Sequence, residues 1–275
     1  MTLEIGWFGT GTGSTSPKLL SAALEAIRSG HLDARIAFVF CNREPGEDEQ
    51  SDHYHALVRE AAIPLFTLSD RRFRKERGGD IARKGEPLPA WRRDFDREVM
   101  RLIEPHSFDV GVLVGYKLIL CDEAADRWDL LNLHPAAPGG PTGLWQDVIW
   151  ELIEARAELG GVMMHLATAQ LDEGPPVTYC TYAIRGPSFD HLWREAESRS
   201  VAQIKAEQGE ANPLFAEIRR QGVAREIPLV IETLRAFAAG RVRIEAKRVV
   251  DRAGEPIAPF DLTAEIERCV AQAPA

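Results

Sequence analysis

Cysteine and positive charge are both in short supply in this chain of 275 residues. The cysteines Cys41, Cys121, Cys180 and Cys269 form no Cys-x-x-Cys pair, which excludes the spacing of zinc ribbons and of thioredoxin-like redox sites. Sparse, scattered cysteine is typical of a reducing compartment, and we expect a cytoplasmic protein. The 33 Lys and Arg are outnumbered by 42 Asp and Glu, and the resulting net charge of −9 argues against a nucleic-acid partner bound through its phosphates.

Long hydrophobic runs are also missing. No apolar stretch reaches the roughly 20 residues needed to span a bilayer, so we expect no membrane partner. The first residues lack the basic start and long apolar stretch of a signal peptide, and they predict a strand instead. With 45% apolar and 27% charged residues the composition is globular, and the chain is long enough to bury a full core without disulfides or metals.

The first half of the chain alternates between short apolar runs and helical patterns. The runs at residues 3–8, 35–40, 63–68, 109–115 and 130–134 predict strands. The fourth run is apolar without interruption, as expected of a strand that is buried on both faces. This alternation predicts an α/β fold with a doubly wound, mostly parallel, Rossmann-like sheet, in which ligands bind at the carboxyl ends of the strands.

The second half has strand patterns at 161–168 and 177–184 and is otherwise mainly helical. Further elements are expected as helices at 188–207, 214–221 and 227–239, a hairpin at 241–251 and a terminal helix at 262–272. We expect one catalytic domain over residues 1–240, with a helical insertion at about 206–225. Residues 241–275 are expected to form a small C-terminal extension.

A basic segment at residues 69–90 interrupts the otherwise acidic chain. It holds seven Lys and Arg residues together with several Gly and Pro, and this composition predicts a long inserted surface loop. The loop is either a solvated connection or an electrostatic lure or lid for an anionic substrate, and the sequence leaves both interpretations open.

A glycine-rich loop follows the first predicted strand and precedes a helix. Gly9, Gly11 and Gly13 let the backbone approach a ligand closely, and the helix N-terminus presents free N–H groups to an anion. The loop is not a P-loop, and Ser14 replaces the third glycine of a dinucleotide fingerprint. No acidic residue ends the second strand to hold a ribose diol. A phosphorylated small molecule is therefore favoured over a nicotinamide cofactor, and the alternative is a loop that only turns the chain.

Asn132 and His134 lie two residues apart at the end of a predicted strand that Pro135 terminates. Alternation places both side chains on the same side of that strand. An Asn amide can donate a hydrogen bond to a developing oxyanion, and a His can exchange a proton near neutral pH. The alternative for His134 is a structural histidine whose hydrogen bonds are satisfied in the core.

A further candidate is Asp172, in the turn that runs from Leu171 to Pro175. Its carboxylate could orient His134, stabilise the His134 cation or hold a water, and the alternative is a turn without chemistry. We expect no metal site, because His53 and His55 are two residues apart on a predicted helix and so face different ways.

Together these motifs resemble the formyltetrahydrofolate-dependent formyltransferases, most closely the type that acts on glycinamide ribonucleotide. The resemblance runs from the first strand to Gly240 and is most specific around the Asn-Leu-His-Pro and Leu-Asp-Glu-Gly-Pro motifs. It places the family's catalytic trio on Asn132, His134 and Asp172. The family's phosphate loop, whose backbone N–H groups hold the substrate phosphate, corresponds to Gly11, Thr12, Gly13, Ser14 and Thr15.

The resemblance also implies a folate site. Its expected members are a strand end, a pterin-wrapping loop and an arginine near the folate tail: Tyr116, Lys117, Leu118, Ile119 and Leu120; Ala169, Gln170 and Leu171; and Arg92. The chain departs from the family at Leu118, where the family often has an Arg. The neighbouring Lys117 could take the place of that Arg. The chain departs again where residues 143–146 replace a stretch that usually carries histidines.

The implied reaction transfers a formyl group from the co-substrate 10-formyltetrahydrofolate to the amine of glycinamide ribonucleotide, in purine biosynthesis. Asn132 and a protonated His134 would stabilise the oxyanion, with Asp172 favouring the charged imidazole, and no metal is needed. The alternatives are transfer to another amine such as a nucleotide-linked amino sugar, hydrolysis of formyltetrahydrofolate, and a non-catalytic folate- or phosphate-binding domain. The expected partner is a small phosphorylated amine, and a homodimer is left open.

Overall fold

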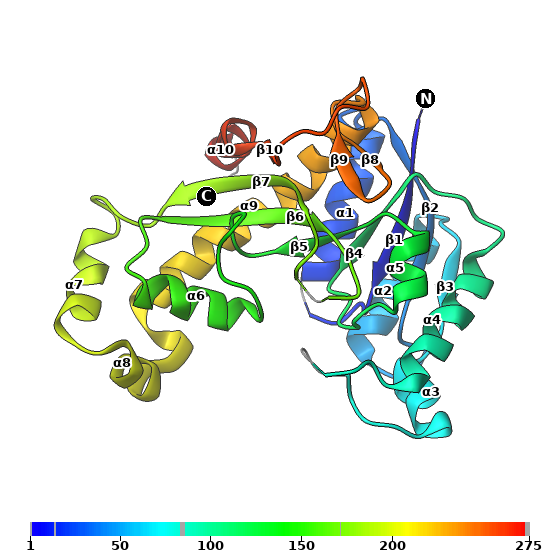
Figure 1. Cartoon of the computed structure of the whole chain (residues 1–275), viewed down its shortest axis with the longest axis horizontal. Helices are drawn as coiled ribbons and strands as arrows, with labels where there is room; N and C mark the ends of the chain where they lie inside the picture. Colours follow the sequence, from blue (N-terminus) through cyan, green and yellow to red (C-terminus); the bar gives the residue numbers. More distant parts are fainter. Residues whose placement is uncertain (1, 14, 83–85, 171, 273–275) are drawn as a thin grey trace. The chain divides into compact units, whose positions relative to one another are not determined.

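The computed structural model describes residues 2–13, 15–82, 86–170 and 172–272 (Figure 1). Its main sheet has the strand order β10-β7-β6-β5-β4-β1-β2-β3. The strands of this sheet are β1 (Leu3–Gly9), β2 (Ala34–Cys41), β3 (Leu65–Thr67), β4 (Val110–Val114), β5 (Leu130–His134), β6 (Leu159–Leu166), β7 (Pro176–Ala183) and β10 (Phe260–Asp261). Parallel pairing joins β1 to β2 and β4, β2 to β3, β4 to β5, and β7 to β10. The predicted doubly wound, mostly parallel sheet is therefore confirmed.

Helices connect most of the strands. They are α1 (Thr15–Arg28), α2 (Glu49–Glu60), α3 (Asp70–Arg77), α4 (Ala90–Ile103), α5 (Asp122–Arg127), α6 (Trp145–Glu154), α7 (Asp190–Ser198), α8 (Val201–Gln208), the 3₁₀ turn η1 (Gly209–Ala211), α9 (Pro213–Ala238) and α10 (Thr263–Gln272). The predicted hairpin near the C-terminus is confirmed as β8 (Arg243–Glu245) and β9 (Arg248–Val250), which pair antiparallel. Within the described ranges, no helix is both long and apolar enough to cross a membrane.

The chain divides into two compact units, which are described separately. The first unit comprises Met1–Asn132, His165–Pro175 and Leu234–Ile257, and the second comprises Leu133–Met164, Pro176–Thr233 and Ala258–Ala275. Residues of the expected C-terminal extension thus pack in both units. The expected domain boundary at residue 240 stays a prediction about how the chain is organised.

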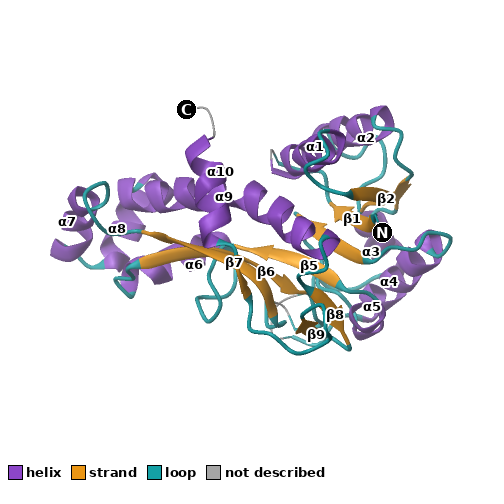
Figure 2. Cartoon of the chain, turned by 90° about the horizontal axis from the view of Figure 1, so that it is seen from above, coloured by secondary structure: helices purple, strands orange, loops and turns teal. Residues whose placement is uncertain are grey.

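In the first unit, helices cover both faces of strands β1 and β2. Figure 2 shows α1 and α2 on one side of these strands and α4 and α5 on the other. Aromatic packing fills the face beneath α4, where the Phe8 ring lies 5.5 Å from the Phe38 ring and 6.1 Å from the Phe40 ring. Trp91 and Phe95 of α4 belong to the same buried cluster. Burial on both faces explains why these strands are almost wholly apolar.

In the second unit, α9 and α10 are tied together by one arginine. Arg225 donates from Nε to Glu267 Oε1 at 2.6 Å and from Nη2 to Oε2 at 3.0 Å. Its guanidinium also lies 4.6 Å from the centre of the Tyr182 ring of β7. A two-bond ion pair over an aromatic ring positions both helices more firmly than a single surface contact would.

The expected loop at 69–90 is only partly a loop, because Asp70–Arg77 form α3. Ser69 caps this helix by accepting a hydrogen bond from the Arg72 backbone N–H at 3.1 Å. Phe73 packs on α4, with its ring 5.4 Å from that of Phe95. A cap, a basic last turn that complements the helix dipole, and one apolar anchor explain the helix.

The expected helix at 188–207 is two helices, because Arg199 is extended between α7 and α8. Ser200 then caps α8 by accepting a hydrogen bond from the Gln203 N–H at 3.3 Å. Extended Arg199 ends the first helix, and Ser200 begins the next because its side chain replaces a missing backbone partner.

Conversely, the two helices expected at 214–221 and 227–239 are one, because α9 continues through Pro228. A proline inside a helix costs one backbone hydrogen bond. The next two residues, Leu229 and Val230, are almost fully buried. Their burial offsets the lost hydrogen bond. A local sequence pattern does not reveal this burial, so it predicts that the helix ends at the proline.

The aromatic cluster predicts where the first unit is most sensitive to truncation. Phe8 is 2% exposed, and we expect Phe8→Ala to lower the free energy of unfolding by about 3–5 kcal/mol through the cavity it leaves. Leu159 is 54% exposed, so Leu159→Ala should change stability by no more than about 0.5 kcal/mol. Urea unfolding followed by circular dichroism measures both, and equal losses in the two variants would contradict this description of the core.

Candidate active site

The loop between β1 and α1, which is expected to bind a phosphate, is built on two glycines. Gly11 and Gly13 adopt positive φ values of 71° and 78°, which favour glycine. A Cβ at Gly11 would lie 2.8 Å from the ring of Tyr54, so this position also requires glycine for space. Thr12 is half-buried and Thr15 opens α1, whereas Ser14 lies outside the described residues.

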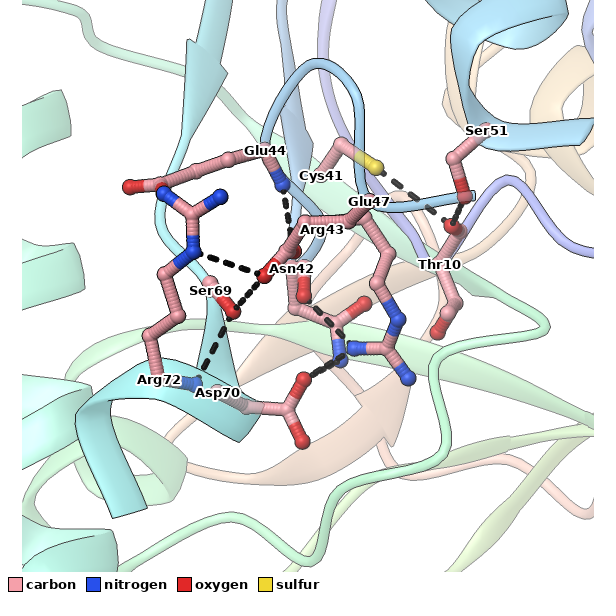
Figure 3. Close-up of polar contacts among 10 residues, drawn as sticks. All are labelled: Thr10, Cys41, Asn42, Arg43, Glu44, Glu47, Ser51, Ser69, Asp70 and Arg72. Atoms are coloured by element: carbon pink, nitrogen blue, oxygen red, sulfur yellow. Dashed lines mark hydrogen bonds and ion pairs between the residues drawn. The ribbon is translucent and has the colours of Figure 1, made fainter. Parts of the chain in front are cut away.

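The base of this loop is fixed from two sides. The Thr10 carbonyl accepts hydrogen bonds from Ser51 Oγ at 3.0 Å and from Cys41 Sγ at 3.4 Å (Figure 3). Burial raises the pKa of the Cys41 thiol to about 12, so it remains a neutral donor at physiological pH. The end of β2 and the first turn of α2 thereby hold the loop in place.

One expected phosphate-binding group already has a partner within the protein. The Gly13 N–H donates to Gln50 Oε1 at 2.6 Å. Gln50 stands on an exposed part of α2, two residues after the Asp48 cap. The Gly13 N–H thus donates to an uncharged carboxamide oxygen, and its hydrogen bond to an anion would be stronger than this one.

A polar network joins the end of β2 to the inserted helix α3 (Figure 3). Arg43 forms an ion pair with Asp70 and donates to the Asn42 carbonyl at 2.7 Å. Ser69 Oγ donates to Glu47 Oε1 at 2.6 Å. The beginning of the basic insertion is therefore anchored beside the end of β2.

Arg92, expected near the folate tail, is fully buried in α4. Its Nη2 donates to Asp96 Oδ1 at 2.8 Å and to the Ile119 carbonyl at 2.7 Å. Asp96 also accepts from the Cys121 backbone N–H at 2.7 Å, and burial raises the pKa of Asp96. In this arrangement Arg92 shapes the expected folate segment from behind and presents no surface to solvent.

In the segment expected to bind folate, which follows β4, Lys117 is the one exposed side chain. Lys117 is exposed, whereas Tyr116 and Leu118 pack against the core cluster of the first unit. Ile119 is half-buried and Leu120 is buried. Lys117 is therefore the only cationic side chain of this segment. It is the neighbour of Leu118, which stands where the family often has an arginine.

The structure brings Asn132 and Asp172 together through a histidine that the motifs did not single out. Asn132 Nδ2 lies 3.1 Å from His165 Nε2, and the same nitrogen lies 3.8 Å from Asp172 Oδ1. His165 is 2% exposed. A signal for it was present, because His165 is the one polar side chain in the otherwise apolar run of β6.

A short hydrogen bond sets the register of this group. The Ala167 N–H donates to the Leu130 carbonyl at 2.7 Å. Further along the same two segments Gly161 lies against Ala137, so the segments run antiparallel. Ala167 is two residues after His165 and Leu130 is two residues before Asn132, so this antiparallel pairing brings the two side chains level with each other. The contact is therefore a consequence of strand register.

The turn that carries Asp172 is closed by an unusually close backbone approach. A Cβ at Gly174 would lie 1.6 Å from the Leu166 carbonyl oxygen, which no side chain can occupy. Asp172 itself adopts a φ of 60°, and Pro175 accepts from the Leu166 N–H at 2.9 Å. Of the expected loop members, Ala169 is half-buried and Gln170 is exposed, while Leu171 lies outside the described residues.

His134 belongs to the second unit and is 2% exposed. Its Nε2 lies 2.8 Å from the Pro141 carbonyl oxygen, so Nε2 carries a proton and donates it. His134 follows Asn132 by two residues in β5, which puts both on the same side of the strand. Trp145 belongs to the stretch that replaces the family's usual histidines, and its ring centre lies 5.9 Å from that of Phe215 in α9.

Among the described residues, no three His, Cys, Asp or Glu side chains are placed to share a metal ion.

The amino-acid sequence of the chain is similar to a known protein family and to known proteins. Residues 8–185 match the formyl transferase family, and the chain belongs to that family. A phosphoribosylglycinamide formyltransferase of Schizosaccharomyces pombe is 28% identical over 180 residues, which cover 61% of this chain and 76% of the relative. The chain is thus a formyltransferase, and its family uses formyltetrahydrofolate as co-substrate.

Solved structures agree with the fold. The phosphoribosylglycinamide formyltransferase of Coxiella burnetii superposes with a TM-score of 0.64 at 20% identity, covering 95% of this chain and 99% of that one. A formyltetrahydrofolate deformylase of Burkholderia mallei reaches 0.59 at 17% identity, covering 91% of this chain and 71% of that one. Both likenesses concern the fold, so they do not separate a transferase from a hydrolase.

The contact between Gly13 and Gln50 predicts a change in anion affinity. Gln50→Ala should free the Gly13 N–H and tighten binding of inorganic phosphate by about two- to tenfold, the value of one hydrogen bond. Gln50→Glu should weaken it, because a carboxylate repels the anion. Isothermal titration calorimetry of both variants and the native protein checks this, and three equal affinities would contradict it.

The Gly174 turn predicts a site that tolerates no side chain. Gly174→Ala should displace the turn and lower kcat/KM for formyl transfer by about tenfold to hundredfold, because a small misplacement of reacting groups is costly. Glu173 is exposed in the same turn, and Glu173→Ala should keep nearly full activity. Steady-state kinetics with both proteins tests this, and an active Gly174→Ala variant would refute it.

Proposed function

We propose that the protein transfers the formyl group of 10-formyltetrahydrofolate to the amine of glycinamide ribonucleotide. The observation that carries this proposal is the linked pair of Asn132 and Asp172, with His134 two residues along the same strand as Asn132. The glycine loop after β1 adds backbone donors suited to a phosphate. The relative in Schizosaccharomyces pombe is named for the same reaction.

The proposed chemistry is an acyl transfer between two nitrogens. The substrate amine attacks the formyl carbon, and the carbonyl electron pair moves onto oxygen. Asn132 donates an amide N–H, and a protonated His134 supplies positive charge, to that developing oxyanion. When the carbon–nitrogen bond to the folate breaks, the proton lost by the amine passes to the leaving nitrogen, with Asp172 as the nearby carboxylate that relays it.

The binding roles are divided between the two ends of the site. The backbone N–H groups of Gly11 to Thr15 hold the phosphate of the amine substrate. The folate lies along residues 116–120 and 169–171, where exposed Lys117 supplies the cation for an anionic folate tail. Arg92 acts from behind this segment, through its bond to the Ile119 carbonyl.

The test is a spectroscopic assay of tetrahydrofolate release from 10-formyltetrahydrofolate, with and without glycinamide ribonucleotide. Release that requires the nucleotide supports the proposal. Release without any amine would show a hydrolase instead. Release only with a different amine, such as a nucleotide-linked amino sugar, would keep the donor and replace the acceptor.

Replacing the proposed histidine gives a sharper test of the chemistry. His134→Ala should lower kcat by about 10²–10⁴-fold, the usual contribution of a group that handles a proton or a developing charge. Its circular dichroism spectrum should match that of the native protein. His53 is exposed on α2, and His53→Ala serves as the matched control with full activity. A fully active His134→Ala protein would overturn the mechanism.

A further inference from the structure

We propose that His165 is a positioning residue for the oxyanion donor: its neutral imidazole holds the Asn132 carboxamide in one orientation. This inference rests on the proposed role of Asn132 and deepens it. It assigns a function to a residue that the family motifs around Asn132, His134 and Asp172 leave out.

The ring contacts of His165 match one tautomer of the neutral imidazole. Its Nδ1 lies 3.2 Å from the Leu166 carbonyl oxygen, which can only accept, so Nδ1 carries the proton. In the neutral imidazole the other nitrogen is then an acceptor. Nε2 accepts from the Asn132 Nδ2 amide at 3.1 Å, and the two bonds are mutually consistent.

The same contacts limit what Asn132 can do. A carboxamide nitrogen has two N–H bonds, about 120° apart in the amide plane. One of these N–H bonds is directed to His165. This contact fixes the plane of the amide and which side of it carries the nitrogen and which the oxygen. The other N–H bond remains as the donor for the oxyanion. A rotated amide would point its oxygen at that position and would repel the developing negative charge.

Burial makes this arrangement hard to replace. His165 is 2% exposed, so bulk water cannot reach this position and replace the acceptor nitrogen of the ring. Asp172 lies 3.8 Å from Nε2, beyond hydrogen-bonding distance. Asn132 Nδ2, at 3.1 Å, thus lies nearer to that nitrogen than the Asp172 carboxylate does.

The variants separate positioning from packing. His165→Leu removes the acceptor and keeps similar bulk, and we expect kcat to fall about tenfold to hundredfold with KM values for both substrates within about twofold. That pattern marks an interaction that matters in the transition state. His165→Gln restores an acceptor oxygen and should recover kcat to within about fivefold. Met164→Leu, one residue earlier in β6, should keep native kinetics.

A double-variant cycle tests whether His165 acts through Asn132. If it does, Asn132→Ala combined with His165→Leu should be no slower than Asn132→Ala alone, because the amide to be positioned is already gone. Losses that multiply would show a separate structural role and overturn the inference. Full activity of Asn132→Ala would instead overturn the proposed function.

A readout that needs no activity completes the experiment. In nitrogen-15 NMR spectra, the Asn132 side-chain amide, assigned by its loss in Asn132→Ala, should show one hydrogen-bonded proton shifted downfield. His165→Leu should move it to the position of a free carboxamide, and His165→Gln should restore it. An Asn132 signal that is identical in the native and His165→Leu proteins would overturn the inference even if the enzyme's acceptor proves to be a different amine.

Discussion

The approach of Gly174 to the Leu166 carbonyl is the contact on which the candidate site depends. The backbone returns so closely that a Cβ would lie 1.6 Å from the carbonyl oxygen. This return brings the turn with Asp172 against the end of β6, where His165 reaches Asn132. A motif that looks like an ordinary Asp-x-Gly-Pro turn is therefore a geometric requirement, and its glycine is the residue that the geometry cannot exchange.

A parallel sheet explains why groups so distant in sequence act together. The strands β1, β4 and β5 lie side by side and run in the same direction, so their carboxyl ends share one edge. The glycine loop proposed to bind the phosphate follows β1, the segment proposed to bind folate follows β4, and Asn132 lies near the end of β5. In the proposed function each loop has a different chemical role, and the apolar strands behind them provide a rigid support.

The sequence patterns predicted the parts of the fold that depend on local order. Uninterrupted apolar runs such as 109–115 identify buried parallel strands, as β4 confirms. The anion-binding role of the glycines after β1 stays a prediction. Tertiary packing decided the rest: α9 continues through Pro228 because its neighbours are buried, and Arg92 turns inward because Asp96 provides a partner. His165 was missed because its role depends on strand register, which a motif does not encode.

The measurement that tests the account most directly follows the fate of the formyl group. The protein is given 10-formyltetrahydrofolate with an isotopically labelled formyl carbon, together with glycinamide ribonucleotide, and the products are examined by NMR. The account predicts that the label appears as an N-formyl group on the nucleotide, at a rate that His134→Ala lowers by about 10²–10⁴-fold. Label recovered as free formate, in the presence or absence of the nucleotide, would contradict it.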